Sequence, residues 1–197
     1  RAARFLAPRR RRGLVPGLSQ IREYRQPYGV VGLITPWNYP LTLTISDAVP
    51  ALLAGNAVVL KPAEQTPFSA LRAAQLFAEA GLPDGLYQVL TGFGEVLGPP
   101  LIDGADFVGF TGSTEVGRLV AARAGARLIP CSLELGGKNP MLVLEDADLD
   151  RAVDGAVRGC FANAGQLCIT FERLDVARAV FAPFVERLVA RIERLVA

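Results

Sequence analysis

Short runs of β-branched and aliphatic residues alternate along this chain with longer segments that have apolar residues at helical spacing. The strand-like runs cover residues 29–34, 57–60, 87–90 and 107–110. Parallel strands need a connection that crosses over the sheet, and that connection is usually a helix. The alternation therefore predicts an α/β protein with an open parallel sheet and flanking helices.

Capping residues mark both ends of one predicted helix. Thr66 is placed to be its N-cap, Pro67 takes the first helical position, and Gly81 ends it before Pro83. From the helical spacing we expect the buried face to contain Leu71, Ala74, Phe77 and Ala78.

Length and charge exclude several classes of protein. A chain of 197 residues can bury a substantial core, and a net charge of +2 gives no overall bias toward nucleic acid or an anionic membrane. No apolar run reaches the roughly 18 residues that span a bilayer. We therefore expect neither a nucleic acid nor a membrane partner. The basic run Arg9–Arg12 fits a phosphate-binding arm, part of a targeting peptide or an exposed turn, and we favour the turn.

The cysteines and the missing histidine limit the chemistry. The chain has three cysteines and no histidine, and it lacks both a C-x-x-C spacing and a secretory signal pattern. These features argue against a disulfide framework and a metal site, and they favour a reducing cytoplasm. Cys131 and Cys160 lie in apolar runs, so we expect them to be small buried side chains.

Cys168 is the candidate nucleophile, and Glu134 is its candidate partner. A free thiol has a pKa of about 8.5, so a nearby base or dipole must raise its thiolate fraction at neutral pH. With no histidine to serve, Glu134 in the glycine-flanked run Leu133–Lys138 becomes the leading candidate for the base.

A possible phosphate site follows the strand 107–110, where Thr111, Gly112 and Ser113 lead into a helix. Free N–H groups and the positive end of a helix dipole meet at such a turn. The spacing of Gly112 and Gly117 is G-x-x-x-x-G rather than G-x-G-x-x-G. The turn alone therefore leaves a nucleotide site and an ordinary connection equally open.

Two other motifs follow predicted strands. Lys61 and Glu64 could bind the hydroxyls of an adenosine ribose, but on this motif alone we favour an exposed turn with an incidental ion pair. Prolines on either side of Asn38 could hold its amide as a donor to an oxyanion. The alternative is a proline-bounded turn around a buried Trp37.

Taken together, five motifs resemble the aldehyde dehydrogenase superfamily in order and spacing, from about Tyr28 to the end of the chain. Detail in residues 29–41 and 65–71 is similar to the branch that contains succinate-semialdehyde dehydrogenases. The motifs are Thr35-Pro-Trp-Asn-Tyr-Pro40, Lys61-Pro-Ala-Glu64, Phe110-Thr-Gly-Ser-Thr-Glu-Val-Gly117, Glu134-Leu-Gly-Gly-Lys138 and Asn163-Ala-Gly-Gln-Leu-Cys168.

The resemblance implies oxidation of a small aldehyde to a carboxylic acid with NAD(P)+. Cys168 would attack the aldehyde, Asn38 and the backbone N–H of Cys168 would hold the oxyanion, and Glu134 would activate the hydrolytic water. NAD is favoured over NADP, because the carboxylate of Glu64 would repel a 2′-phosphate. No metal is implied. The implied cofactor contacts are Thr35, Pro36, Trp37, Lys61, Glu64, Gly94, Thr111, Gly112, Ser113, Val116 and Leu135, with Gly94 and Val116 lining the adenine cleft.

The resemblance also implies a domain plan and a departure from it. Residues 1–27 would form an N-terminal strand and linker region, 28–135 a Rossmann-like dinucleotide-binding domain, and 136–197 the truncated start of a second α/β catalytic domain. The parent protein would be a homodimer or homotetramer. Because the chain looks like an internal fragment, a non-catalytic nucleotide-binding fragment or pseudoenzyme is the alternative, and a structural scaffold is a third. Ser46-Asp47 replaces the Arg-Lys pair of many semialdehyde-oxidising relatives, which leaves the substrate open.

Overall fold

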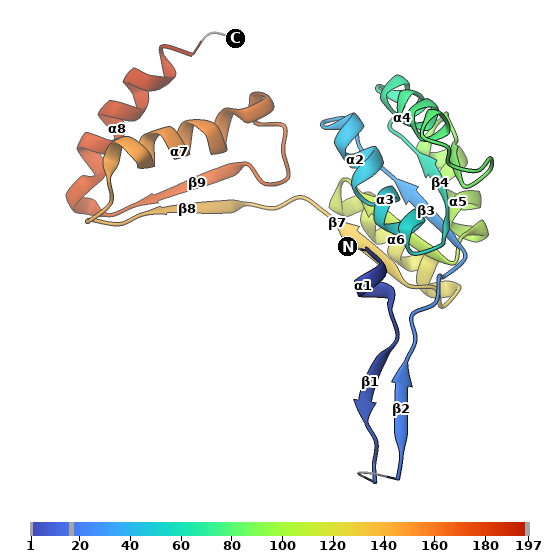
Figure 1. Cartoon of the computed structure of the whole chain (residues 1–197). Coiled ribbons are helices and arrows are strands. Elements are labelled where there is room, and N and C mark those ends of the chain that lie inside the picture. Colours follow the sequence, from blue (N-terminus) through green and yellow to red (C-terminus); the bar gives the residue numbers. More distant parts are fainter. Residues whose placement is uncertain (1, 16–17, 196–197) are drawn as a thin grey trace. The chain divides into compact units, whose positions relative to one another are not determined.

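The computed structural model describes residues 2–15 and 18–195, which fold as two compact units, 1–134 and 135–197 (Figure 1). Within the described residues, no helix is both long and apolar enough to cross a membrane.

A five-stranded parallel sheet forms the centre of the first unit, with strand order β5-β4-β3-β6-β7. This confirms the predicted open parallel sheet. Strand β3 lies in the middle and is largely buried, in keeping with its run of Val, Gly, Leu and Ile. The strands are β3 (Val30–Ile34), β4 (Ala57–Lys61), β5 (Tyr87–Val89), β6 (Phe107–Thr111) and β7 (Cys131–Glu134).

Helices cover both faces of this sheet. Right-handed crossovers place the helices that connect β3, β4 and β5 on one face and those that connect β5, β6 and β7 on the other. The chain reverses its direction of travel across the sheet between β3 and β6, which is the position where open α/β sheets bind ligands. The first face has α2 (Pro40–Ser46), α3 (Ala48–Leu53) and α4 (Pro67–Glu79), and the second has α5 (Gly94–Gly104) and α6 (Thr114–Ala126).

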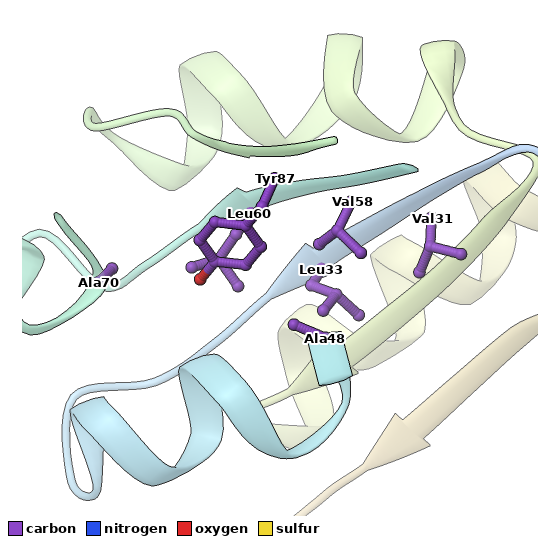
Figure 2. Packing of buried hydrophobic residues seen from close by; sticks show 7 residues of the cluster. All are labelled: Val31, Leu33, Ala48, Val58, Leu60, Ala70 and Tyr87. Carbon is purple, nitrogen blue, oxygen red and sulfur yellow. The ribbon is translucent and has the colours of Figure 1, made fainter. Parts of the chain in front are cut away.

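The main core lies between the first face and the sheet. Figure 2 shows side chains of β3 and β4 packed against α3, α4 and Tyr87 of β5. Helix α4 begins at Pro67 with Thr66 as its N-cap, as predicted, although the Thr66 side chain makes no capping hydrogen bond. Its expected buried face was wrong at Leu71 and Ala78, which are exposed. The helix is rotated so that Ala70 and Ala73 are buried instead, with Ala74 and Phe77 packed beside them.

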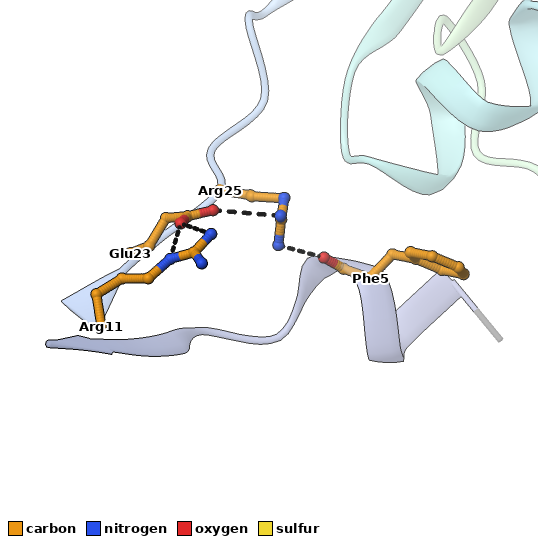
Figure 3. Close-up of polar contacts among 4 residues, drawn as sticks. All are labelled: Phe5, Arg11, Glu23 and Arg25. Atoms are coloured by element: carbon orange, nitrogen blue, oxygen red, sulfur yellow. Dashed lines mark hydrogen bonds and ion pairs between the residues drawn. The ribbon is translucent and has the colours of Figure 1, made fainter.

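An antiparallel hairpin of β1 (Arg9–Arg12) and β2 (Gln20–Glu23) follows the short helix α1 (Ala2–Leu6). Glu23 accepts hydrogen bonds from Arg11 and Arg25, and Arg25 also donates to the Phe5 carbonyl (Figure 3). The hydrogen bond from Arg11 is the main reason that the pKa of Glu23 is lowered. The basic run is exposed, as expected, but the predicted turn is wrong because these residues form a strand.

The second unit contains β8 (Asn139–Val143), α7 (Leu149–Phe161), the 3-10 turn η1 (Ala162–Gly165), β9 (Phe171–Val176) and α8 (Arg178–Ile192). Strands β8 and β9 pair in parallel, with α7 as part of their connection. The carboxylate of Asp148 caps α7 by accepting from the N–H groups of Asp150 and Arg151. The two strands and two helices enclose a small core of Val143, Val153, Ala156 and Phe184.

Candidate functional site

The predicted site residues of the first unit lie at or just beyond the carboxyl ends of its strands. Thr35 and Asn38 follow β3, Lys61 ends β4, Thr111 ends β6 and Glu134 ends β7. Because all five strands are parallel, these ends share one edge of the sheet. The sheet therefore brings together side chains that are far apart in the sequence.

Lys61, Glu64 and Gly94 form one polar cluster at this edge. The Lys61 side chain is buried, and its Nζ lies 2.7 Å from Glu64 Oε1. The same oxygen accepts a hydrogen bond of 2.6 Å from the backbone N–H of Gly94, the first residue of α5. Burial by itself raises the pKa of Glu64, but the hydrogen bonds from Lys61 and the backbone outweigh it, and the net pKa is lowered. The cluster holds Glu64 as an anion.

A mainly apolar cavity of about 550 Å³ lies beside this cluster, between α5 and α6. Glu64, Gly94 and Val116 contribute to its wall, so three of the predicted cofactor residues meet there. The rest of the wall could not be predicted from the sequence, because residues of one strand end and two helices become neighbours only in the fold. Those residues are Ile34, Glu95, Gly98, Pro99, Ile102, Leu119, Val120 and Arg123.

The turn between β6 and α6 presents a helix N-terminus. Ser113 is the N-cap of α6, and its hydroxyl accepts from the N–H of Val116 at 3.3 Å. A Cβ on Gly112 would lie 2.6 Å from the ring of Phe110, so this position has no room for a side chain. Thr111 is half-buried at the end of β6. The turn can offer backbone donors to an anion, as predicted for a phosphate site.

The segment after β3 presents a threonine, a tryptophan and an amide. Thr35 is buried, and its hydroxyl has no hydrogen-bond partner among the described residues. Trp37 is 44% exposed, so the alternative of a turn around a buried tryptophan is wrong. Pro36 and Asn38 are half-buried, and Asn38 Oδ1 accepts from the N–H of Tyr39 at 3.1 Å.

Glu134 lines a second cavity, of about 290 Å³, on the face of the sheet covered by α2 and α3. Asp47 contributes a second carboxylate to the same cavity. Desolvation raises the pKa of Asp47, and the negative charge of Glu134 raises it further. Among the residues that the structure describes, no lysine or arginine lines this cavity. This acidic lining agrees with the sequence, in which Ser46-Asp47 stands where the resemblance would place an Arg-Lys pair.

Cys168 belongs to the second unit and lies in the loop between η1 and β9. Its side chain is exposed, whereas Cys131 and Cys160 are half-buried rather than fully buried as expected. Burial raises the pKa of the Cys160 thiol, which makes it a poorer nucleophile. Leu135, the other predicted site residue of this unit, is half-buried at its start. Across the described ranges, no group of three or more Cys, Asp or Glu is placed to hold a metal ion.

Comparison with protein-family models gives a match over residues 9–197 to the model described as "Aldehyde dehydrogenase family". Among curated proteins, the chain is 53% identical over 186 residues to a protein of Mycolicibacterium smegmatis named as a candidate succinate-semialdehyde dehydrogenase [NADP(+)]. The match covers 94% of this chain and 36% of that protein. A betaine aldehyde dehydrogenase of Oryza sativa is 46% identical over 84% of this chain and 33% of its own length.

Solved structures give the same result. An aldehyde dehydrogenase from Brucella melitensis biovar abortus matches with a TM-score of 0.95 and 40% identity, over 99% of this chain and 41% of that one. A succinate-semialdehyde dehydrogenase from Burkholderia pseudomallei matches with a TM-score of 0.93 and 37% identity, over 100% of this chain and 41% of the other. This chain therefore spans well under half the length of the relatives that it matches.

Proposed function

The chain belongs to the aldehyde dehydrogenase family, and we propose that it supplies the dinucleotide cleft and the nucleophile of an enzyme that oxidises an aldehyde to a carboxylic acid with NAD(P)+. Residues 28–135 would bind the dinucleotide, and residues 136–197 would begin the catalytic domain. The observation that carries this proposal is the exposed thiol of Cys168, in a chain whose other unit has the Lys61–Glu64 cluster beside an apolar cavity.

In the proposed first step, the Cys168 thiolate adds to the aldehyde carbon. A carbon–sulfur bond forms, and the carbonyl oxygen becomes an oxyanion that the Asn38 amide and the backbone N–H of Cys168 stabilise. A bound dinucleotide would supply the two-electron oxidation, as the acceptor of the hydride that leaves this carbon. Cys168 would then hold the acyl group as a thioester.

Hydrolysis of the thioester completes the proposed reaction. Glu134 takes a proton from water as the water oxygen attacks the thioester carbon. The carbon–sulfur bond breaks, the Cys168 thiolate leaves, and the carboxylic acid is released. The sum is aldehyde, NAD(P)+ and water giving acid, NAD(P)H and a proton. Glu134 favours this outcome over transfer of the acyl group to another acceptor.

The residues present fit a dinucleotide. The 550 Å³ cavity between α5 and α6 has the apolar walls that an adenine ring needs, and Lys61 and Glu64 lie beside it to bind ribose hydroxyls. The N-terminus of α6 at Ser113 would bind the pyrophosphate. The buried hydroxyl of Thr35, without a partner among the described residues, is available to a bound group at the same edge.

The surroundings of Glu64 bear on the choice between NAD and NADP. The NAD preference expected from Glu64 finds no support in the relatives, because the mycobacterial proteins are named for NADP(+). The contacts of Glu64 give a physical reason why a 2′-phosphate can be accepted beside it. Lys61 and the Gly94 N–H both bind its Oε1, and they offset its repulsion of that phosphate. We therefore propose that the cleft accepts either dinucleotide.

Fluorescence titration and alkylation test this proposal on the chain itself. NAD+ or NADP+ should quench Trp37, the single tryptophan of the chain, and Lys61→Ala should weaken that binding at least tenfold. Iodoacetamide should label Cys168 before Cys131 and Cys160. Saturable binding without preferential labelling would support the alternative, a non-catalytic nucleotide-binding fragment. If neither response is observed, a structural scaffold is the alternative that remains.

A further inference from the structure

The loop that presents Cys168 is held by a side chain outside all five motifs. Nδ2 of Asn139 donates to the backbone carbonyl of Cys168 at 2.7 Å and to that of Thr170 at 3.1 Å. We propose that Asn139 is the positioning residue of the nucleophile loop, residues 166–170 between η1 and β9. From the start of the neighbouring strand, it fixes the main chain of Cys168.

The geometry of the parallel pair explains why an amide is suited to this task. Asn139 is the first residue of β8 and pairs with Phe171, and the register is irregular between Asn139 and Pro140. Pro140 has no N–H to donate. The –NH₂ group of asparagine carries two N–H donors, so one side chain can serve both carbonyls just ahead of β9.

The loop needs such an anchor because the turn η1, from which it starts, is strained. Asn163 and Ala164 have φ angles of 51° and 55°, in the left-handed region that side chains disfavour. A strained segment persists only where surrounding contacts fix it. At the helix side, the Thr170 hydroxyl donates to the Gly165 carbonyl at 3.1 Å. Asn139 supplies the matching contact at the strand side.

Gly137 gives an independent reason to assign this role. A Cβ on Gly137 would lie 3.2 Å from Oδ1 of Asn139, closer than ordinary contact. A side chain there would press on the amide that binds the loop. The second glycine of the Leu-Gly-Gly-Lys run thus leaves room for Asn139.

The consequence for chemistry rests on the proposed function. Fixing the Cys168 carbonyl restricts the rotation of its peptide units, and with them the position of Sγ and the direction of the N–H that would stabilise the oxyanion. Asn139 itself would touch neither substrate nor cofactor. Its loss should therefore lower kcat and leave KM for the aldehyde nearly unchanged.

Asn139→Asp tests the assignment, because aspartate has the same shape but, when ionised, no donor for the two carbonyls. The matched control is Lys138→Gln, which breaks the exposed Lys138–Glu172 ion pair one residue away and leaves the Cys168 contact intact. The measurement is amide hydrogen exchange of both variants and the parent chain. The amides of Gln166 and Thr170 report on the loop, because Gln166 donates to the Asn163 carbonyl and Thr170 donates to the Leu167 carbonyl.

Asn139→Asp should speed exchange at Gln166 and Thr170 at least tenfold, while amides in the core of the unit, such as Val153, stay protected and Lys138→Gln has no effect. Unchanged loop exchange would overturn the proposal, as would faster exchange throughout residues 135–197, which indicates a general role in folding. Where turnover is measurable, kcat should fall at least tenfold with KM within twofold. The exchange result stands even if aldehyde oxidation is disproved, so the two failures are distinguishable.

Discussion

Single residues with the same functional groups have different surroundings in this chain, and those surroundings assign their chemistry. The three cysteines are a clear case, because only Cys168 is exposed among the described thiols. The carboxylates are another: hydrogen bonds lower the pKa of Glu64, whereas desolvation raises that of Asp47. Each difference can be tested by one substitution or one reagent.

Iodoacetamide should alkylate Cys168 at least ten times faster than Cys160 at neutral pH. Cys168 is exposed, whereas burial raises the pKa of Cys160 and so reduces its thiolate fraction. Peptide mass spectrometry of a time course measures both rates. Cys168→Ser is the control and should abolish the fast phase; a fast phase that persists in this variant would contradict the assignment.

Glu64→Gln should lower the free energy of unfolding by about 1 kcal/mol at pH 7. The pKa of Glu64 is lowered in the folded chain, so its contribution is present above the unfolded value near 4.5 and is lost as pH falls through the folded value. Urea denaturation between pH 3 and 7 checks this. The difference in the free energy of unfolding between the parent and variant chains should shrink toward acid pH. A difference that is independent of pH would show that the charge of Glu64 does not contribute to stability.

The carboxyl ends of β3, β4, β6 and β7 determine which of the predicted site residues share one edge of the sheet. The sequence predicted β3 to β6 because their apolar runs are bounded by Gly, Pro and Asn. It predicted the face of α4 less well: alanine and leucine both fit a helical stripe, and Ala70 is the residue that packs with Tyr87 and β4, while Ala73 is buried as well. The hairpin was missed because four arginines give no apolar alternation, and pairing with β2 decides their conformation.

Helix α7 offers a matched pair of glycine substitutions. A Cβ on Gly159 would lie 2.2 Å from the ring of Phe171, whereas one on Gly155 would lie 3.6 Å from Met141, an ordinary contact. Gly159→Ala should therefore destabilise the second unit by about 1–3 kcal/mol through overpacking. Gly155→Ala should be neutral or stabilise it by about 0.5–1 kcal/mol, because alanine favours a helix. Thermal melts compare the two; equal effects would mean that Phe171 does not pack on α7 as described.

At the scale of the whole molecule, the chain is two units that each bury a core of their own. The residue pattern predicted the sheet and proposed Cys168, Glu134 and Asn38 as site residues. The resemblance implied a cleft lined by Gly94 and Val116, but not the rest of the wall of the cavity between α5 and α6. Neither predicted the contacts of Asn139. Those depend on crossovers and on backbone positions that bring distant residues together, and periodicity carries no information about them.

Core substitutions should act on one unit each. Leu60→Ala removes a fully buried side chain of the first core, and Phe184→Ala removes one of the second. Each should cost about 2–5 kcal/mol in its own unit. Hydrogen exchange separates the two, since residues 30–34 should lose protection only with Leu60→Ala and residues 139–143 only with Phe184→Ala. Loss of protection in both units from either change would mean that they unfold together.

The central claim, that this chain carries the nucleophile and dinucleotide cleft of an aldehyde oxidation, is tested most directly by absorbance at 340 nm. Protein, NAD+ or NADP+ and an aldehyde are mixed, with Cys168→Ala as the comparison. A rise in absorbance should require all three components and should disappear in Cys168→Ala, although that variant still binds the dinucleotide. A rise that survives in Cys168→Ala, or a parent chain that neither binds the dinucleotide nor gives a rise, would overturn the proposal.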